Sequence, residues 1–239
     1  MRLDKYLANS GTGSRSEIRK ILAKGLVCVN GLVVKDGALK INETDRVEYN
    51  GCDIISREHL YFKIDKPECV LTAMEDPRLS CIGDYIPAGL KNRRLSPVGR
   101  LDYHTTGLLI ITNDGDLSHR LTSPRYKVDK CYLVSYEGEK LTEEHVRLFA
   151  QGITLDDTDE EIRLKPAKLE LTGDNSCVLT ISEGKTHQVR RMIAKFGRSV
   201  TGLRRLKIGK LDLEGTASGV LTELSEQEID YLKTLTGLN

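Results

Sequence analysis

Two short glycine-containing stretches have residue types that bind phosphate in other proteins. Gly11-Thr12-Gly13 begins like a dinucleotide fingerprint, but the third glycine position is Ser16 and no strand pattern precedes it. Gly184-Lys185-Thr186 matches the end of a P-loop, whose leading glycine position is Leu179 here. Both nucleotide motifs are therefore excluded. A helix beginning at Thr186, with Lys185 and His187 beside it, would still offer its N-terminus to one phosphate.

The cysteine, histidine and serine residues of this chain do not have the spacing of a known metal site or of a serine hydrolase. The six cysteines contain no CxxC pair, which disfavours a zinc knuckle, and dispersed thiols suit a reducing compartment better than a disulfide scaffold. The five histidines have no metal-ligand spacing, and no G-x-S-x-G elbow is present. No metal or organic cofactor is expected. Residue types alone do not single out one carboxylate as catalytic.

The charge distribution indicates a polyanionic partner. The chain has 239 residues, enough for one or two domains of about 150 residues, and a net charge of only +1. Residues 1–35 contain seven Lys and Arg against Asp4 and Glu17, and residues 185–210 contain nine Lys and Arg with no acidic residue. Two basic segments on a nearly neutral chain predict a polyanion contacted at two places. Aromatic residues make up only 5%, so a broad base-stacking platform is not expected.

Membrane association is not expected. The longest aliphatic run is Leu108-Leu109-Ile110-Ile111, far short of the roughly 20 residues of a membrane span. The N-terminal sequence carries Asp4 and has no apolar stretch, so it does not have the pattern of a secretory signal. We expect a cytoplasmic protein.

Residues 1–50 have the pattern of a small module with two helices and a sheet. A short helix is expected over 3–9, and a second begins after Ser14, whose spacing to Glu17 is that of a capping box, and runs through Lys24. Asn30-Gly31 lies between two apolar runs and predicts a hairpin, and a strand at 47–49 is followed by another Asn-Gly. Residues 52–59 show no clear element and are the expected linker. The predicted domains are 1–55 and 60–239.

The remainder of the chain mixes short strands and helices without βα alternation. Strands are expected at 61–64, 108–112, 131–136, 167–171 and 177–181, and helices through Leu121, from Thr142 to about Gln151, from Thr186 to Gly197 and after Ser225. This order favours an α+β fold, with a mainly antiparallel mixed sheet in the larger domain and a small helix and hairpin module before it.

Five stretches together resemble the RsuA family of pseudouridine synthases. They are GRLDYHTTGLLIITNDGDLSHRLTSPR at 99–125, KCYLV at 130–134, EGKTHQVRRM at 183–192, LRR at 203–205 with Ile208-Gly209, and an N-terminal run of RLDKYL, SRSEIRKIL and VNG. The N-terminal run resembles the RNA-binding module of the ribosomal-protein-S-four type. The resemblance covers nearly the whole chain, and its GRLD and HQVRRM stretches are the most specific.

The resemblance implies isomerisation of uridine in RNA, with base flipping and without a cofactor. It makes Asp102 the essential carboxylate, acting on the ribose as a nucleophile or as a base, and Arg190 the cation that pairs with it. Tyr132 would stack on the uracil and Leu203 would pack against the flipped base. The expected RNA contacts are Arg2, Arg15, Arg19 and Lys20 in the first module, and Arg100, Lys185, His187, Arg191 and Arg204 in the second.

The sequence leaves three hypotheses about function. The TTG after Asp102-Tyr103-His104, SHRLTSPR and HQVRRM resemble enzymes of small-subunit ribosomal RNA or its precursor particle more than their large-subunit relatives. A large-subunit synthase is the nearest alternative. A non-catalytic ribosome-assembly protein that binds RNA is the alternative from another class. We expect a monomer.

Overall fold

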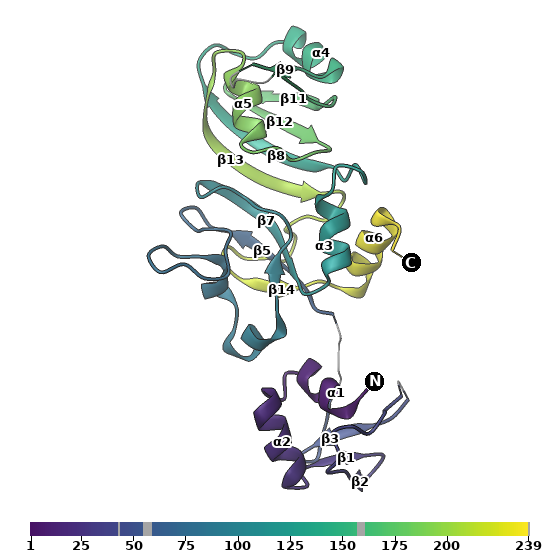
Figure 1. The fold of residues 1–239 in the computed structure, drawn as a ribbon. Helices are drawn as coiled ribbons and strands as arrows, with labels where there is room; N and C mark the ends of the chain where they lie inside the picture. The colour runs from purple at the N-terminus through teal and green to yellow at the C-terminus, as the bar shows by residue number, and fades with distance from the viewer. Residues whose placement is uncertain (43, 55–58, 157–160, 239) are drawn as a thin grey trace. The chain divides into compact units, whose positions relative to one another are not determined.

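The computed structural model describes residues 1–42, 44–54, 59–156 and 161–238. The chain divides into two compact units, which are described separately (Figure 1). Unit 1 comprises Met1–Leu60 with Ile86–Leu95, and unit 2 comprises Tyr61–Tyr85 with Ser96–Asn239.

Unit 1 packs two helices against a four-stranded sheet. Its elements are α1 (Leu3–Asn9), α2 (Arg15–Ala23), β1 (Val27–Val29), β2 (Leu32–Val33), β3 (Val47–Tyr49) and β4 (Cys52–Asp53), with the sheet order β2-β1-β3-β4. Leu3, Leu7, Ile18 and Leu22 of the helices pack with Val27, Val29, Ile41 and Val47. The predicted helices, the Ser14–Glu17 capping box and the Asn30-Gly31 hairpin are confirmed.

The expected linker at 52–59 begins with a strand. Cys52 and Asp53 form β4, which pairs with β3 across the Asn50-Gly51 turn, so the absence of an element there was a wrong prediction. Two residues are too few for an alternating pattern, which explains the error. Residues 55–58 of the predicted linker lie outside the described residues.

Unit 2 is built on one mixed sheet in the order β11-β12-β8-β13-β7-β5-β14, with β6 also pairing with β7. The strands are β5 (Tyr61–Lys66), β6 (Ser96–Pro97), β7 (Thr105–Thr112), β8 (Lys130–Glu137), β11 (Lys168–Gly173), β12 (Ser176–Ile181), β13 (Ser199–Ile208) and β14 (Leu221–Glu223). A separate ribbon joins β9 (Thr154–Leu155) to β10 (Ile162–Arg163). The β13–β7 pair is parallel and the other pairs are antiparallel, which confirms the predicted α+β class.

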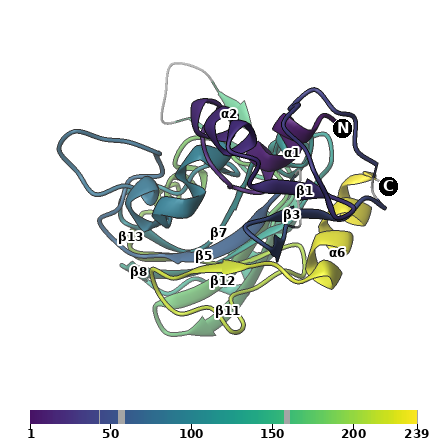
Figure 2. The same cartoon turned by 90° about the horizontal axis from the view of Figure 1, so that it is seen from below.

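The helices of unit 2 cover different parts of this sheet. They are α3 (Gly115–Thr122), α4 (Glu143–Gln151), α5 (Gln188–Ala194) and α6 (Glu226–Thr236), with short 3-10 turns η1 (Ile82–Tyr85) in unit 2 and η2 (Ala88–Arg93) in the segment grouped with unit 1. Helices α3 and α6 lie side by side, and α4 and α5 lie near β11 and β13 (Figure 1). Figure 2 shows strands β5, β7, β8, β11 and β12 of this sheet from below. Leu117, Leu121 and Leu232 of α3 and α6 pack with Leu108 and Ile110 of β7. This packing covers the face of β7 that carries Leu108 and Ile110.

Two sequence predictions in unit 2 need correction. The helix expected from Thr186 to Gly197 spans only Gln188–Ala194, because His187 adopts a left-handed conformation with φ of 50°. The phosphate site expected at a helix beginning at Thr186 is therefore not formed there. The longest strand, β13, was not predicted, because register shifts at Val200/Gly202 and Arg205/Lys207 disturb its alternation.

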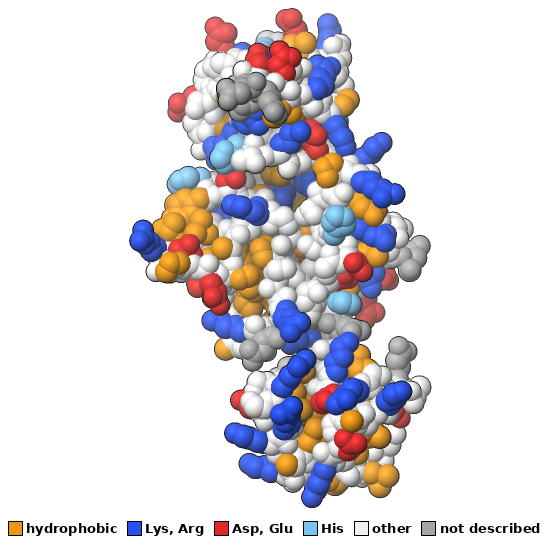
Figure 3. Space-filling view, in the orientation of Figure 1, with side chains coloured by type: hydrophobic (Ala, Val, Ile, Leu, Met, Phe, Trp, Pro, Cys, Tyr) orange, Lys and Arg blue, Asp and Glu red, His pale blue; other side chains and the backbone are white. Residues whose placement is uncertain are grey.

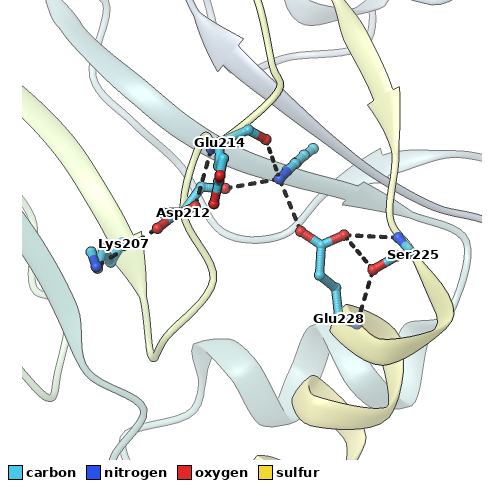
Figure 4. A network of polar contacts seen from close by, with 6 residues as sticks. Lys207, Asp212, Glu214, Ser225 and Glu228 are labelled. Atoms are coloured by element: carbon cyan, nitrogen blue, oxygen red, sulfur yellow. Dashed lines mark hydrogen bonds and ion pairs between the residues drawn. The ribbon is translucent and has the colours of Figure 1, made fainter.

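A buried lysine connects β5 to the C-terminal part of unit 2. Lys63 Nζ donates to the carbonyl oxygens of Asp212 and Glu214 at 3.2 and 2.9 Å and to Glu228 Oε1 at 2.9 Å. Figure 4 labels the three acceptor residues. Glu228 also accepts from Ser225, at the capping box that begins α6. The loop, the helix and the sheet are thus held at one point. Among the described residues, no helix is both long and apolar enough to cross a membrane.

Candidate active site

Asp102 lies on a tight loop between β6 and β7. The Thr105 amide donates to the Asp102 carbonyl oxygen at 3.0 Å, and the preceding residue, Leu101, exchanges two hydrogen bonds with Thr72. The Asp102 side chain is 40% exposed, and its Oδ1 lies 3.5 Å from His187 Nε2. The loop therefore presents a reachable carboxylate on a backbone that is fixed on both sides.

Lys66 fixes this loop by hydrogen bonds to its backbone. Its side chain is fully buried, and Nζ donates to the carbonyl oxygens of Pro67, Tyr103 and Thr105 at 2.9, 3.3 and 2.9 Å. Burial lowers the pKa of Lys66 to about 8, against the attraction of the nearby Cys69, Asp102 and Glu68 groups. One ammonium group thus fixes the end of β5 and the residues that follow Asp102.

The sheet register brings Tyr132 and Leu203 to the same face. Residues opposite each other on paired strands project to one side of a sheet. Leu203 of β13 is opposite Thr105 of β7 and Val134 of β8, and Tyr132 is opposite Arg205. Tyr132, Leu203, Thr105 and Arg205 therefore share a face, called here the site face, which Lys66 joins across Gly107. Tyr132 and Leu203 are only 9% and 7% exposed.

The site face contains three buried cations. Besides Lys66, Arg205 is 4% exposed and donates through Nε to the Leu108 carbonyl oxygen at 2.7 Å, while its Nη2 has no hydrogen-bond partner among the described residues. Lys130 lies two residues before Tyr132, and burial together with the charge of Arg205 lowers its pKa to about 8. Three positive charges on the site face favour the binding of anions there.

Arg190 does not pair with Asp102 in this structure. Its Nη1 donates to the Val200 carbonyl oxygen at 3.2 Å, next to the beginning of β13. The basic side chain beside Asp102 is instead His187, which immediately precedes α5. Arg190 is thus engaged with β13 in this structure, and its pairing with Asp102 stays a prediction.

The other predicted RNA-binding residues of unit 2 differ in availability. Arg100, Lys185 and His187 are exposed, and Arg191 lines a hollow of about 310 Å³ with Asp156 and Lys195. Arg204 is different, because its Nη2 lies 2.7 Å from Oδ2 of the buried Asp65. That ion pair gives Arg204 a structural function in the sheet, and its contact with RNA stays a prediction.

Unit 1 exposes the cations that the sequence indicated. Arg15, Arg19 and Lys20 of α2 are exposed, and Lys and Arg side chains are spread over the face of this unit seen in Figure 3. Arg2 makes a two-pronged contact with Asp4, at 3.0 and 2.7 Å, and its hydrogen bond is the main cause that lowers the pKa of Asp4. The exposed basic side chains of α2 are therefore more available for RNA than Arg2, which is paired with Asp4.

Lys66, Lys130 and Arg205 are the residues of this site that sequence reasoning missed. Lys66 lies beyond the strand expected at 61–64, and Lys130 enters only as the first residue of the stretch at 130–134. Strand alternation would have placed Leu203 and Arg205 on one face and Arg204 on the other, had β13 been predicted.

Comparison with protein families gives two matches. Residues 60–195 match the model described as RNA pseudouridylate synthase, and residues 1–47 match the S4 domain.

Individual relatives match over nearly their whole length. The chain is 40% identical to the ribosomal small subunit pseudouridine synthase A of Pasteurella multocida (strain Pm70), over 96% of this chain and 98% of that one. It is 36% identical to the ribosomal large subunit pseudouridine synthase B of Bacillus subtilis (strain 168), over 98% and 96%. A crystal structure of a pseudouridylate synthase, 36% identical, superimposes with a TM-score of 0.67 over 97% of this chain and 99% of that one.

Proposed function

The chain belongs to the RNA pseudouridylate synthase family, and from this premise we propose that it isomerises uridine to pseudouridine at one site of ribosomal RNA, with Asp102 as the essential carboxylate. The observation that carries the proposal is the position of Asp102, partly exposed on a loop in which the carbonyl oxygens of Tyr103 and Thr105 are fixed by the buried Lys66. The ribosomal substrate is supported by the names of the relatives.

The reaction needs no external group. The bond from C1′ of the ribose to N1 of uracil breaks, the base turns, and a bond from C1′ to C5 forms, while C5 loses a proton and N1 gains one. Asp102 acts either as a nucleophile at C1′ or as a base at the neighbouring carbon. Both functions require an ionised carboxylate in a fixed position. The exchange is redox-neutral and uses no metal or organic cofactor.

Tyr132 and Leu203 receive the base in this proposal. A uridine stacked in an RNA helix must be turned out, which costs a few kcal/mol. Tyr132 stacks on the uracil and Leu203 packs against it, and their common face supports these assignments. Arg100 fills the gap left by the base or holds an adjacent phosphate.

The basic residues around Asp102 bind the RNA backbone. Lys185, His187 and Arg191 contact phosphates, which position the RNA without reading its sequence. Arg190, through the Val200 carbonyl oxygen, holds the beginning of β13 and so the position of Leu203.

The two regions of the chain have different functions in this proposal. We assign residues 1–55 to RNA binding, with Arg2, Arg15, Arg19 and Lys20 as its contacts, and residues 60–239 to catalysis. A tethered RNA-binding module raises the effective concentration of the catalytic region at its target. We propose that the enzyme acts as a monomer in the cytoplasm.

Small-subunit RNA, free or in a precursor particle, is the proposed substrate. Relatives named as small-subunit enzymes are up to 40% identical, and the large-subunit relative is 36% identical. The TTG, SHRLTSPR and HQVRRM stretches support the same choice. The large-subunit RNA is the second candidate.

Substitution of Asp102 tests the catalytic assignment. Asp102→Asn keeps the shape of the side chain and removes the charge, so isomerisation is lost while RNA affinity stays within about twofold. The matched control is Asp116→Asn, at an exposed position in the first turn of α3. An Asp102→Asn protein that works at the wild-type rate would remove Asp102 from the catalytic site, whereas a wild-type protein that binds RNA without isomerising it would favour the non-catalytic assembly protein.

Mapping pseudouridine in total ribosomal RNA, with and without the gene, tests the substrate. Carbodiimide labelling followed by reverse transcription gives a stop at each pseudouridine. Loss of one stop in small-subunit RNA is the expected result, and loss of one in large-subunit RNA would move the substrate to the second candidate. If all stops remain after redundancy has been checked, ribosomal RNA is not the substrate.

A further inference from the structure

Three metal-binding side chains converge next to the loop that carries Asp102. They are Glu68 and Cys69, which follow β5, and His104 of the loop. The Cys69 Sγ lies 3.8 Å from His104 Nδ1, and Glu68 Oε1 lies 3.4 Å from the same nitrogen. All three ligand atoms lie within 4.8 Å of one another. None of these residues has a function in the proposed isomerisation.

We propose that Glu68, Cys69 and His104 form a binding site for Zn²⁺ that clamps the Asp102 loop to the end of β5. A tetrahedral zinc ion with ordinary bond lengths separates a thiolate from an imidazole nitrogen by about 3.6 Å, and a nitrogen from a carboxylate oxygen by about 3.4 Å. The two separations in this chain are close to those values. The fourth position remains for water.

The donor set suits zinc in type and in charge. Thiolate and imidazole favour zinc over magnesium or calcium, which take oxygen ligands. One thiolate and one carboxylate balance the two positive charges of the ion. The ligand side chains are exposed, so the ion can enter from solvent.

The backbone already holds the two segments in register. The Cys69 amide donates to the Tyr103 carbonyl oxygen at 3.0 Å, and Lys66 Nζ bonds to the carbonyl oxygens of Tyr103 and Thr105. Cys69 itself has φ of 59°, a conformation that favours glycine. Cys69 therefore occupies a position at which the backbone conformation would favour glycine. Bound zinc adds a link between side chains to the existing links through the backbone.

Cobalt titration of the full-length, tag-free protein tests the site independently of catalysis. After removal of metal by a chelator, one equivalent of Co²⁺ is expected to produce the near-ultraviolet thiolate-to-cobalt absorption band. Cys69→Ser removes the band, and His104→Gln and Glu68→Gln weaken binding by at least about tenfold. The matched controls Cys52→Ser and His119→Gln, at exposed positions elsewhere, leave the band unchanged. A wild-type protein without the band, or a band that persists in Cys69→Ser, would overturn the site.

Two further measurements use Zn²⁺ itself. Alkylation of Cys69 by iodoacetamide, followed by mass spectrometry, slows by at least about tenfold with zinc, whereas alkylation of Cys52 does not. Hydrogen exchange of the amides at 102–106 slows with zinc in the wild type and not in Cys69→Ser. Unchanged exchange in a protein that binds zinc would overturn the clamp. Because neither measurement uses RNA, failure here is distinct from failure of the isomerase assignment.

Discussion

Lys66 combines two properties that make a single residue sensitive to pH. It is fully buried, and its pKa is lowered by burial to about 8. In its charged form it can donate three hydrogen bonds, which matches the three carbonyl oxygens that it contacts. A neutral amine would have only two donors and would direct a lone pair at the third carbonyl. The position of the Asp102 loop therefore depends on the protonation of Lys66.

We expect the rate of isomerisation to fall as the pH rises through about 8. Lys130→Met, which removes the other buried lysine with a pKa near 8, keeps this alkaline limb, whereas Lys66→Met lowers the rate at neutral pH and removes the limb. The measurement is a profile of kcat against pH for the three proteins. An unchanged limb in Lys66→Met would mean that Lys66 does not set it.

The ammonium group of Lys66 should also make the stability of the fold depend on pH, and the stability should rise where the rate falls. Its pKa in the folded chain, about 8, lies below the ordinary value of 10.5, so the unfolded state binds more protons between these values. The contribution of Lys66 to the free energy of unfolding therefore rises with pH from about 8 to about 10.5. Denaturant unfolding of wild type and Lys66→Met across this range measures the contribution as a difference. A difference that falls with pH would contradict the direction of the shift.

At the scale of single residues, the sequence predicted the site only through its resemblance to a family. Asp102, Tyr132 and Leu203 have no distinctive local spacing, because β8, β7 and β13 come from distant parts of the chain. Lys66 and Arg205 were missed since burial of a cation depends on the sheet around it. The roles of Asp102 and Tyr132 remain predictions, and the Asp102→Asn substitution above tests the first.

Among the elements, the parallel contact between β13 and β7 depends on a glycine. Gly107 has φ of 104°, and a Cβ there would lie 2.2 Å from the Arg205 carbonyl oxygen and 2.7 Å from its nitrogen. Gly107 is also opposite both Arg205 and Lys66, so its missing side chain leaves room for two buried cations.

Gly107→Ala is therefore expected to destabilise the chain by about 3 kcal/mol or more, because a backbone contact in a central strand cannot move aside. Gly115→Ala is the matched control, since a Cβ at Gly115, the first residue of α3, meets nothing within 4 Å. Its effect should lie within about 1 kcal/mol of zero. Urea unfolding of both variants measures the difference, and equal stabilities would show that β13 and β7 can separate locally.

The contact between β5 and α6 depends on Lys63 and Glu228 (Figure 4). Desolvation raises the pKa of Glu228, but hydrogen bonds from Lys63 and Ser225 outweigh it, so the net pKa is lowered. A carboxyl group with a lowered folded pKa stabilises the fold above its unfolded value, near 4.5, and loses that contribution as the pH falls through the folded value.

Lys63→Met should cost about 2–4 kcal/mol at pH 7, because Glu228 and two carbonyl oxygens lose their buried donor. Glu228→Gln should cost less, and its difference from wild type should disappear in acid. The exposed Glu226 of the same helical turn provides the control Glu226→Gln, which should change little. A Glu228→Gln difference that is the same at pH 7 and in acid would contradict the lowered pKa.

The elements were predicted best where a local rule governs them. The capping box at Ser14, the helix that begins after Ser225 and the Asn30-Gly31 turn depend on neighbours in sequence, and they were predicted correctly. Helix α5 was predicted too long and β13 was missed. In both cases the decisive feature is tertiary: a left-handed His187 in the first, and pairing with two strands despite register shifts in the second.

At the scale of the whole molecule, basic surface is divided between the two units. RNA binding that uses phosphate contacts from both should weaken steeply as salt increases, since each contact releases counterions.

Charge reversal at Arg15 and Arg19 tests the share of unit 1. The double variant Arg15→Glu, Arg19→Glu should reduce the slope of log affinity against log salt by about 0.7 to 0.9 for each phosphate contact that is lost. Arg147→Glu, at an exposed position of α4 outside the proposed contacts, is the control and should leave the slope nearly unchanged. Filter binding of ribosomal RNA fragments over a salt series makes the measurement. An unchanged slope in the double variant would remove α2 from the RNA contacts.

The central place of β13 also determines the order in which unit 2 can fold. Strands β5, β6 and β7 are made before residue 113 and strands β8, β11 and β12 before residue 182, but the strand that joins the two groups ends at Ile208. A chain emerging from the ribosome at about 5–20 residues per second therefore carries two incomplete sheets with unpaired edges for several seconds. Its contact order is high for the same reason, which slows the closing step. The edges of these two groups of strands therefore stay open to aggregation until β13 has been made.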